Sequence, residues 1–226
     1  MLKGNEERIL ITAQDQGLRT NWFRRNIEGA DVSEKCRLCG DKIETVNTIL
    51  AGCEVLLKRG TYTDRHNRIC KLIHFRLCQK YNISIEANNH WVHTPAAIEE
   101  NNEVLLLYDY RIPTDLHIAE CRPDIVIHNK LERKALVIEV GVPGDTRVTA
   151  YEREKIIKYQ ALKHEIRRMW EVDSVEVIPI VLGATGTVKR SVVPYLEKIP
   201  VKLTTSEMCL EVVRASIGIL KIVLGI

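Results

Sequence analysis

The sequence predicts an α/β (α+β) fold, in which helices flank a mixed β-sheet and a small helical module comes first. Three observations carry this prediction. Four short apolar segments in the second half of the chain alternate with polar turns, as strands do. A long amphipathic segment separates the last two of them, which is typical of a crossover helix. Helical periodicity, without strand patterns, dominates the first third of the chain.

The connections between the predicted strands indicate how they pair. The predicted strands are Val104–Tyr110, Arg122–His128, Lys134–Val142 and Val175–Leu182. Because the turn Asn129–Arg133 is short and polar, the second and third strands should form an antiparallel hairpin. A helix over Val148–Trp170 joins the third strand to the fourth, which predicts a parallel βαβ unit. The sheet is therefore expected to be mixed.

The rest of the chain is arranged around this sheet. We expect a helix over residues 2–28, a basic helix over Asp64–Tyr81 and an irregular linker over Asn82–Asn102. Thr204 and Glu207 have capping-box spacing ahead of a final amphipathic helix. The predicted divisions are a helical linker segment (1–35), a cysteine-bearing segment with the basic helix (36–82), a main domain (90–203) and a C-terminal helix (204–226).

Composition and cysteine usage narrow the class of protein. Residues 1–80 carry 15 Lys/Arg against 10 Asp/Glu, whereas residues 81–226 carry 18 against 20. The basic excess thus lies in the N-terminal third, where a phosphate backbone could bind, although an ordinary solvated surface fits the same counts. Seven cysteines and no signal-peptide pattern predict an intracellular, reduced protein. The apolar stretch Cys209–Ile226 contains three charged residues, so no membrane span is expected.

Two carboxylates lie where apolar strands should bury them. Glu139 interrupts the apolar run Leu136–Val142, and Asp124 opens the apolar part of the preceding strand. A buried carboxylate is costly unless a cation or hydrogen bonds compensate it. A hairpin would bring both acids to one end of the sheet, where their oxygens would suit Mg²⁺. The alternative is a Glu139 that pairs with an arginine or faces water from an edge strand.

Lys155 has an unusual position on the long predicted helix. At about 100° per residue, seven apolar positions of the helix fall within about 60° of Lys155 and form its apolar stripe: Val148, Tyr151, Tyr159, Leu162, Ile166, Met169 and Trp170. An amphipathic helix does not normally place a charge at the centre of its apolar stripe. Lys158 lies at the edge of the stripe, where its ammonium can reach water. An ammonium beside two carboxylates could polarise a phosphate or orient a water molecule, and a non-catalytic salt bridge to Glu139 is the alternative.

These residues form part of an ordered set that resembles a known family. Arg122-Pro123-Asp124, followed after a 14-residue gap by Glu139, is similar to the PD-(D/E)xK nuclease pattern. In detail the chain resembles the restriction-like endonuclease domain of site-specific non-LTR retrotransposon proteins, from about residue 90 to about residue 200. The further matching segments are Tyr108-Asp109-Tyr110, Thr114-Asp115, Val142-Pro143-Gly144-Asp145, Glu154–Gln160 and Gly183–Val188.

The resemblance implies a restriction-endonuclease-like core over residues 90–203, with Asp124 and Glu139 as ligands of Mg²⁺ or Mn²⁺. The chain departs from common restriction folds at one position. Those folds carry a lysine two residues after the glutamate, and here that residue is Gly141. For the retrotransposon enzymes the resemblance implies a lysine from the following helix. The stripe geometry favours Lys155 for this role, with Lys158 as the second candidate.

A zinc knuckle is incomplete in the segment 36–82. Cys36, Cys39 and Cys53 match three positions of the C-x2-C-x8-H-x4-C pattern found in the related elements. Thr48 stands at the histidine position, and threonine is a poor zinc ligand. We therefore expect a degenerate knuckle that has lost its Zn²⁺, unless His66 or another group supplies the fourth ligand.

Basic residues near aromatic ones are candidates for nucleic-acid binding. Such mixtures can hold phosphates and stack bases, although ordinary amphipathic helices show them too. The candidates are Arg19, Arg24 and Arg25, beside Trp22 and Phe23, and Arg65, Arg68 and Lys71 on the basic helix.

The predicted function is that of a metal-dependent DNA endonuclease module of a retrotransposon-derived protein, acting in the nucleus. Mg²⁺-assisted hydrolysis would nick target DNA, and element RNA is a second candidate partner. The resemblance to the retrotransposon proteins implies that this nick primes reverse transcription. The alternative is a catalytically inactive remnant that only binds nucleic acid. Thr48 favours the remnant, whereas the joint presence of Asp124, Glu139 and Lys155 favours the enzyme. A zinc-organised transcription factor fits less well, because its ligand set would be incomplete.

Overall fold

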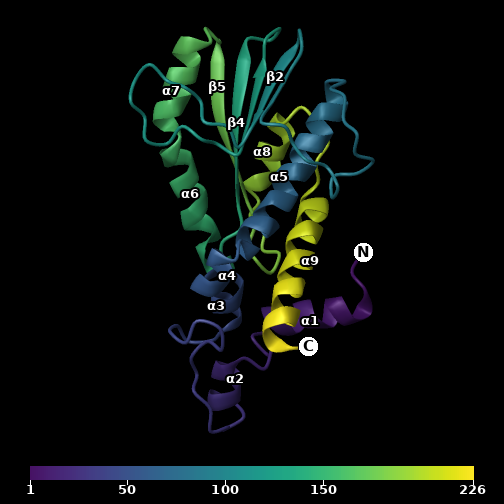
Figure 1. Ribbon diagram of the computed structural model, residues 1–226, viewed down its shortest axis with the longest axis vertical. Coiled ribbons are helices and arrows are strands. Elements are labelled where there is room, and N and C mark those ends of the chain that lie inside the picture. The colour runs from purple at the N-terminus through teal and green to yellow at the C-terminus, as the bar shows by residue number, and fades with distance from the viewer.

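A mixed five-stranded sheet forms the centre of the fold in the computed structural model, which describes residues 1–226 (Figure 1). The order of the strands in the sheet is their order in the chain. Neighbours from β1 to β4 are antiparallel, and β4 and β5 are parallel. The α/β prediction is thus confirmed. The strands are β1 (Ile98–Glu100), β2 (Val104–Tyr108), β3 (Ile125–Asn129), β4 (Lys134–Gly141) and β5 (Ser174–Val181).

The predicted strand connections are also confirmed. β3 and β4 form an antiparallel hairpin in which Ile125 pairs with Ile138. Two helices, α6 (Val148–Lys158) and α7 (Gln160–Met169), connect β4 to its parallel neighbour β5. The prediction of a single helix over Val148–Trp170 is wrong, because Tyr159 interrupts it and separates α6 from α7. A short 3-10 turn, η1 (Asp145–Arg147), precedes α6.

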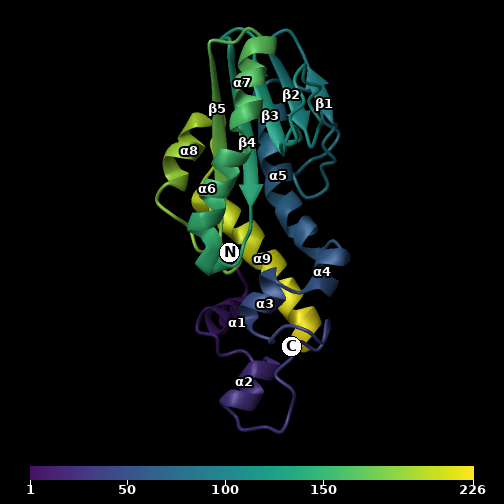
Figure 2. The same ribbon diagram turned by 90° about the vertical axis from the view of Figure 1, so that its left-hand side faces the viewer.

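Helices cover both faces of the sheet. In Figures 1 and 2, α6 and α7 lie on one face, and α5, α8 and α9 lie on the other. Tyr159, Leu162 and Ile166 pack on the first face, and α5, α8 and α9 bury the larger apolar cluster on the second. The remaining helices are α1 (Gly4–Gln14), α2 (Asn21–Asn26), α3 (Val46–Ala51), α4 (Glu54–Lys58), α5 (Thr61–Lys80), α8 (Val192–Lys198) and α9 (Thr205–Leu224).

The C-terminal helix α9 connects the sheet to the N-terminal module. Its first half, through Met208 and Val212, packs into the core of the sheet. Its second half, through Ile217 and Leu220, packs in a separate apolar cluster with α1, α3 and the cysteine segment. The Thr204 side chain accepts a hydrogen bond from the backbone N–H of Glu207, so Thr204 caps α9 as predicted. The reciprocal half of the capping box is not formed, because the Glu207 carboxylate pairs with Arg76. No helix in the molecule combines the length and apolarity needed to cross a membrane.

Several predicted boundaries are wrong for local reasons. The helix expected over residues 2–28 ends early, because Gln16 adopts a left-handed backbone (φ 57°) and Gly17 follows it. The expected linker over 82–102 is largely irregular but contains β1, whose three residues are too few for a period-2 pattern. Four short helices, α2, α3, α4 and α8, were not predicted as separate elements, since five to seven residues give too little periodicity.

A buried ion pair holds the cysteine-bearing segment together. Glu44 is completely buried and accepts hydrogen bonds from the backbone N–H of Asn21 and of Arg37. The Arg37 guanidinium adds further bonds to the same carboxylate, the shortest being 2.7 Å. Burial alone would raise the pKa of Glu44, but these donors outweigh it and hold the pKa below its usual value.

We expect Glu44→Gln to lower the free energy of unfolding by about 2 kcal/mol, because it removes the charge that pairs with Arg37. The loss is smaller than for a fully buried pair, since Arg37 keeps partial access to water. The lowered pKa means that this contribution is present above the ordinary pKa of a glutamate and is lost as the pH falls through the folded-state pKa. Denaturant unfolding should therefore show that the free energy of unfolding falls less between neutral and acidic pH for Glu44→Gln than for the parent. An equal fall in both proteins would contradict a stabilising charge on Glu44.

Candidate active site

Asp124 and Glu139 interlock at one end of the β3–β4 hairpin. Asp124 immediately precedes β3, and Glu139 lies near the end of β4. The backbone N–H of Asp124 donates to Glu139 Oε1 at 3.2 Å, and the backbone N–H of Val140 donates to Asp124 Oδ2 at 2.8 Å. Each carboxylate is thus fixed by the backbone of the neighbouring strand. The structure brings the two predicted acids together.

Lys155 compensates the burial of Glu139. The Glu139 side chain is 1% exposed, and Lys155 Nζ lies 2.6 Å from its Oε2. Burial and the negative charge of Asp124 raise the pKa of Glu139, although Lys155 opposes this shift. Burial would lower the pKa of Lys155, but the charge of Glu139 outweighs it and raises the pKa. The lysine at the centre of the predicted apolar stripe therefore points at the carboxylate pair.

His66 is the site residue that the sequence did not predict in this place. Its Nε2 lies 3.1 Å from Asp124 Oδ2, and its Nδ1 lies 3.1 Å from Asn67 Oδ1. Burial opposes a charge on His66, but the hydrogen bond to Asp124 outweighs it and raises the pKa of the imidazole. Burial would likewise raise the pKa of Asp124, and His66 holds it below its usual value. The expectation that His66 could complete the zinc knuckle is wrong, because its ring faces Asp124.

Gly141 explains why a lysine cannot occupy the position usual in restriction folds. A Cβ atom at Gly141 would lie 2.6 Å from Cε1 of Tyr151, well inside contact distance. The Tyr151 ring packs over this point from α6, and Lys155, one turn further along, has its Nζ 5.5 Å from the centre of that ring. The end of β4 is thus closed to side chains, and α6 supplies the cation instead.

The carboxylate pair opens into a groove between α5 and the sheet. The groove has a volume of about 410 Å³, and Asp124 reaches it while Glu139 stays below. Asp109 lines it with a left-handed backbone (φ 46°), a strained conformation of the kind that gathers at functional sites. The groove is lined by Tyr62, Thr63, His66, Asn67, Cys70, Tyr108, Asp109, Asp124, Val142 and Tyr151.

The oxygen donors at this site fit a hard divalent cation. Both protein hydrogen bonds to Asp124 use Oδ2, which leaves Oδ1 open to a ligand. Mg²⁺ and Mn²⁺ bind carboxylate oxygens and keep several water molecules, so Asp124 can bind one through Oδ1. Glu139 would first have to release a contact, because its two oxygens accept from the Asp124 N–H and from Lys155. His66 and Lys155 now supply the positive charge that the pair needs. A bound cation would take over part of this compensation.

Lys158 does not reach the carboxylate pair. Its Nζ lies 3.2 Å from Glu120 Oε2, and half of the Glu120 side chain is exposed. The same ammonium lies 4.7 Å from the centre of the Tyr159 ring. Of the two predicted catalytic lysines, the structure therefore brings only Lys155 into contact with Glu139.

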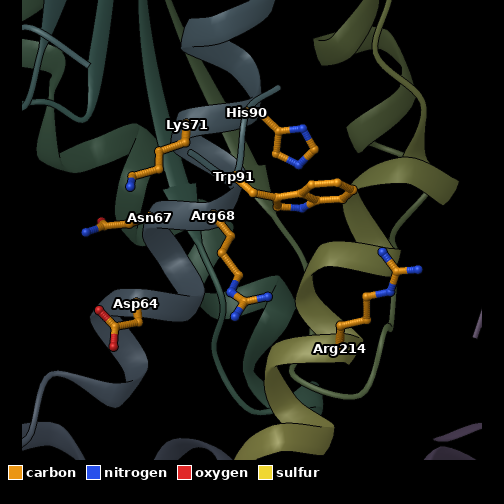
Figure 3. A pocket seen from close by; sticks show the side chains of 7 residues that line it. All are labelled: Asp64, Asn67, Arg68, Lys71, His90, Trp91 and Arg214. Atoms are coloured by element: carbon orange, nitrogen blue, oxygen red, sulfur yellow. The ribbon is translucent and has the colours of Figure 1, made fainter. Parts of the chain in front are cut away.

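A basic pocket adjoins the groove on the outer side of α5. Arg68 and Lys71 of α5 and Arg214 of α9 line it, and Asn67 borders both the pocket and the groove. In Figure 3, Trp91 lies between His90 and the two arginines, Arg68 and Arg214. The indole N–H of Trp91 donates to Glu211 at 3.0 Å, while more than half of the residue is exposed. This pocket combines three cations with an anchored aromatic ring.

The other predicted nucleic-acid contacts fare differently. Arg65 is 1% exposed and donates to Ser216 Oγ and to the carbonyl oxygen of Val142, so its assignment to a nucleic-acid surface is wrong. Its guanidinium joins α5 to α9 and to Val142, the residue that follows β4. Arg19 pairs with Glu28, and Arg24 and Arg25 lie on α2, which Figure 1 places at the end of the molecule remote from the sheet. The structure does not bring these three arginines to the carboxylates.

Three cysteines of the incomplete knuckle do converge. The Sγ atoms of Cys36 and Cys53 are 3.8 Å apart, and those of Cys36, Cys39 and Cys53 all lie within 4.8 Å of one another. The backbone N–H groups of Asp41 and Lys42 lower the pKa of Cys39, whereas burial raises the pKa of Cys36 to about 11. The hydroxyl of Thr48 bonds to that of Thr45 within α3. The three cysteines thus form a cluster, and the Thr48 hydroxyl is hydrogen-bonded to Thr45.

Comparisons with known proteins assign no family to the chain. The chain is an α/β protein with a mixed sheet and a cysteine cluster. No protein-family model matches it, and no curated protein matches it.

Proposed function

We propose that the protein is a metal-dependent DNA endonuclease module, whose active site is Asp124, Glu139 and Lys155. One observation carries the proposal: two carboxylates on adjacent strands interlock at a groove, and a helix-borne ammonium contacts the buried one. An acid that lines a groove, with a second acid and a lysine buried beneath it, can supply the groups that metal-assisted phosphodiester hydrolysis requires. The resemblance to the restriction-like endonuclease domain of retrotransposon proteins supports the same activity, with a nuclear location.

Each residue has a role that follows from its position. Asp124, with Oδ1 open to the groove, and Glu139, below it, would hold Mg²⁺ or Mn²⁺. When bound, such a cation polarises the phosphoryl oxygen and lowers the pKa of bound water. Lys155 would stabilise negative charge that develops on the phosphate, because its ammonium is held in place and only 16% exposed. His66 would retain Asp124 in its orientation through the 3.1 Å contact.

The basic pocket would hold the nucleic-acid strand next to this site. Arg68, Lys71 and Arg214 can each meet a phosphate, and the exposed Trp91 ring offers a surface on which a base can stack. Because Asn67 borders both hollows, a strand bound in the pocket could extend towards the groove. DNA is the proposed partner, and element RNA would fit the same pocket.

We expect Arg68→Ala and Lys71→Ala each to weaken duplex DNA binding, and to reduce the slope of log affinity against log salt by about 0.9 for each phosphate that the variant no longer neutralises. Trp91→Ala should weaken binding of single-stranded DNA more than of duplex, because only unpaired bases stack on it. Arg167→Ala is the matched control, since Arg167 is an exposed cation of α7 on the opposite face of the sheet. Fluorescence anisotropy titrations at several salt concentrations measure both effects. Equally weakened binding by Arg167→Ala would contradict a localised binding surface.

The competing function is a remnant that binds nucleic acid without cutting it. One feature favours it: His66 and Lys155 already neutralise both carboxylates, so the site is stable without a metal ion. The two functions separate in an order-of-addition experiment. DNA is bound to the protein in chelator, and excess Mg²⁺ is then added. An enzyme releases nicked product, whereas a remnant keeps intact DNA bound.

A further inference from the structure

A second group of metal-binding side chains lies away from the proposed active site. His74 and Cys78 stand one turn apart on α5, and His93 comes from the irregular segment that follows this helix. All three residues are at most 4% exposed. One ligand atom from each lies within 4.8 Å of the others. The chain therefore gathers two imidazoles and a thiol in one buried place.

The distances within this group are close to those of a zinc site. Nδ1 of His74 is 2.8 Å from Nε2 of His93, and Sγ of Cys78 is 3.5 Å from the same Nδ1. Tetrahedral Zn²⁺, with bonds of about 2.0–2.1 Å to nitrogen and about 2.3 Å to sulfur, places such atoms roughly 3.3–3.6 Å apart. An ion would need the two imidazoles to separate by only about half an ångström. The three side chains are thus nearly preorganised.

The ring nitrogens of His74 and His93 that face each other share a hydrogen bond, and the buried nitrogen without a partner is Nε2 of His74, which does not face His93. Glu99 of β1 shares a surface hollow with His93, and its charge reaches Cys78. A water molecule in this hollow could complete four-coordination, since the Glu99 carboxylate does not lie within the group of three ligands.

We propose that His74, Cys78 and His93 form a zinc site that fixes the segment 82–97 on α5. The same segment carries His90 and Trp91, so an ion at His93 would also hold the aromatic ring of the basic pocket (Figure 3). The site shares no residue with the proposed active site, although through Trp91 it adjoins the basic pocket.

Cobalt(II) titration tests this site, because bound Co²⁺ reports thiolate ligation through its charge-transfer absorption. The experiment uses the Cys36→Ser/Cys39→Ser variant, which removes the knuckle, with folding checked by circular dichroism. We expect one thiolate-ligated Co²⁺ per chain, with the band intensity of a single thiolate, and displacement by Zn²⁺; an ion on the carboxylates Asp124 and Glu139 would give no thiolate band. Cys78→Ser in this background should abolish the band. His93→Ala should weaken binding by more than the roughly 10–100-fold that removal of an outer partner costs. His164→Ala, at an exposed histidine of α7, is the matched control.

A second readout does not depend on the spectrum. Hydrogen exchange of the backbone amides in 82–97 should slow on addition of Zn²⁺ to the parent, and should not change in the His93→Ala variant. Absence of a charge-transfer band, or a parent band with three-thiolate intensity that only Cys36→Ser/Cys39→Ser removes, would overturn the proposal. Zinc-independent exchange of 82–97 would overturn the proposed role of the ion.

Discussion

Asp124→Asn and Glu139→Gln should each reduce metal-dependent DNA nicking by about a thousandfold or more, since a Lewis-acid cation contributes several kcal/mol to the transition state. Both changes keep the shape of the side chain and remove the charge that would hold the cation. Asp124→Asn keeps an acceptor for the N–H of Val140, so the hairpin should stay intact. Nicking rates at saturating Mg²⁺, with circular dichroism to verify folding, measure the effect.

A matched control makes this expectation specific. Glu120→Gln removes a nearby carboxylate that is half exposed and pairs with Lys158. It should leave the nicking rate unchanged within about twofold, as expected for an exposed ion pair of little energetic weight. Parental nicking rates in either Asp124→Asn or Glu139→Gln would show that the metal site is assigned wrongly.

Lys155→Met should lower the nicking rate by about a hundredfold or more, the scale expected when one preorganised electrostatic stabiliser is removed. The methionine keeps the apolar stem of the side chain and deletes the ammonium that contacts Glu139 at 2.6 Å. Affinity for DNA should barely change, because one phosphate contact contributes little to an interface with several. Lys158→Met should cost clearly less activity, since Lys158 pairs with Glu120 instead.

The free energy of unfolding of Lys155→Met shows whether a lower nicking rate comes from lost catalysis or from lost folding. Lys155→Met leaves Glu139 buried without its cation, which should lower the free energy of unfolding by about 3 kcal/mol in the absence of metal. Glu139→Gln added to it should restore much of that stability, because no unpaired charge is then buried. An active Lys155→Met would mean that Lys155 is only a structural ion-pair partner. An inactive Lys158→Met would move the catalytic role to that residue.

Much of the sheet was predictable because its signals are local. Apolar runs, the short turn Asn129–Arg133 and the crossover between the last two strands determine β2 to β5 and their directions. The approach of Asp124 to Glu139 follows from that hairpin, since adjacent strands align their ends. Lys155 was predictable from helical phase because the α6 part of the helix is regular up to Tyr159.

The remaining features depend on contacts between distant parts of the chain. His66 lies 58 residues before Asp124, and no pattern in α5 shows that its ring turns towards the sheet. In the sequence, Arg65 and Arg68 look like equivalent cations of the basic helix. In the structure, packing against α9 buries Arg65, whereas Arg68 lines the basic pocket. Trp91 lies in a segment without periodicity, so only the fold brings it to Arg214 of α9.

The central claim is that Asp124 and Glu139 support metal-dependent cleavage of DNA. Conversion of supercoiled plasmid to the open circle tests it most directly, with the parent and the Asp124→Asn/Glu139→Gln double variant purified side by side. The account predicts nicking by the parent in Mg²⁺ or Mn²⁺, no nicking in chelator, and no nicking by the double variant under any condition. Bound but uncut plasmid with the parent in both metals, or equal cutting by parent and double variant, would contradict it.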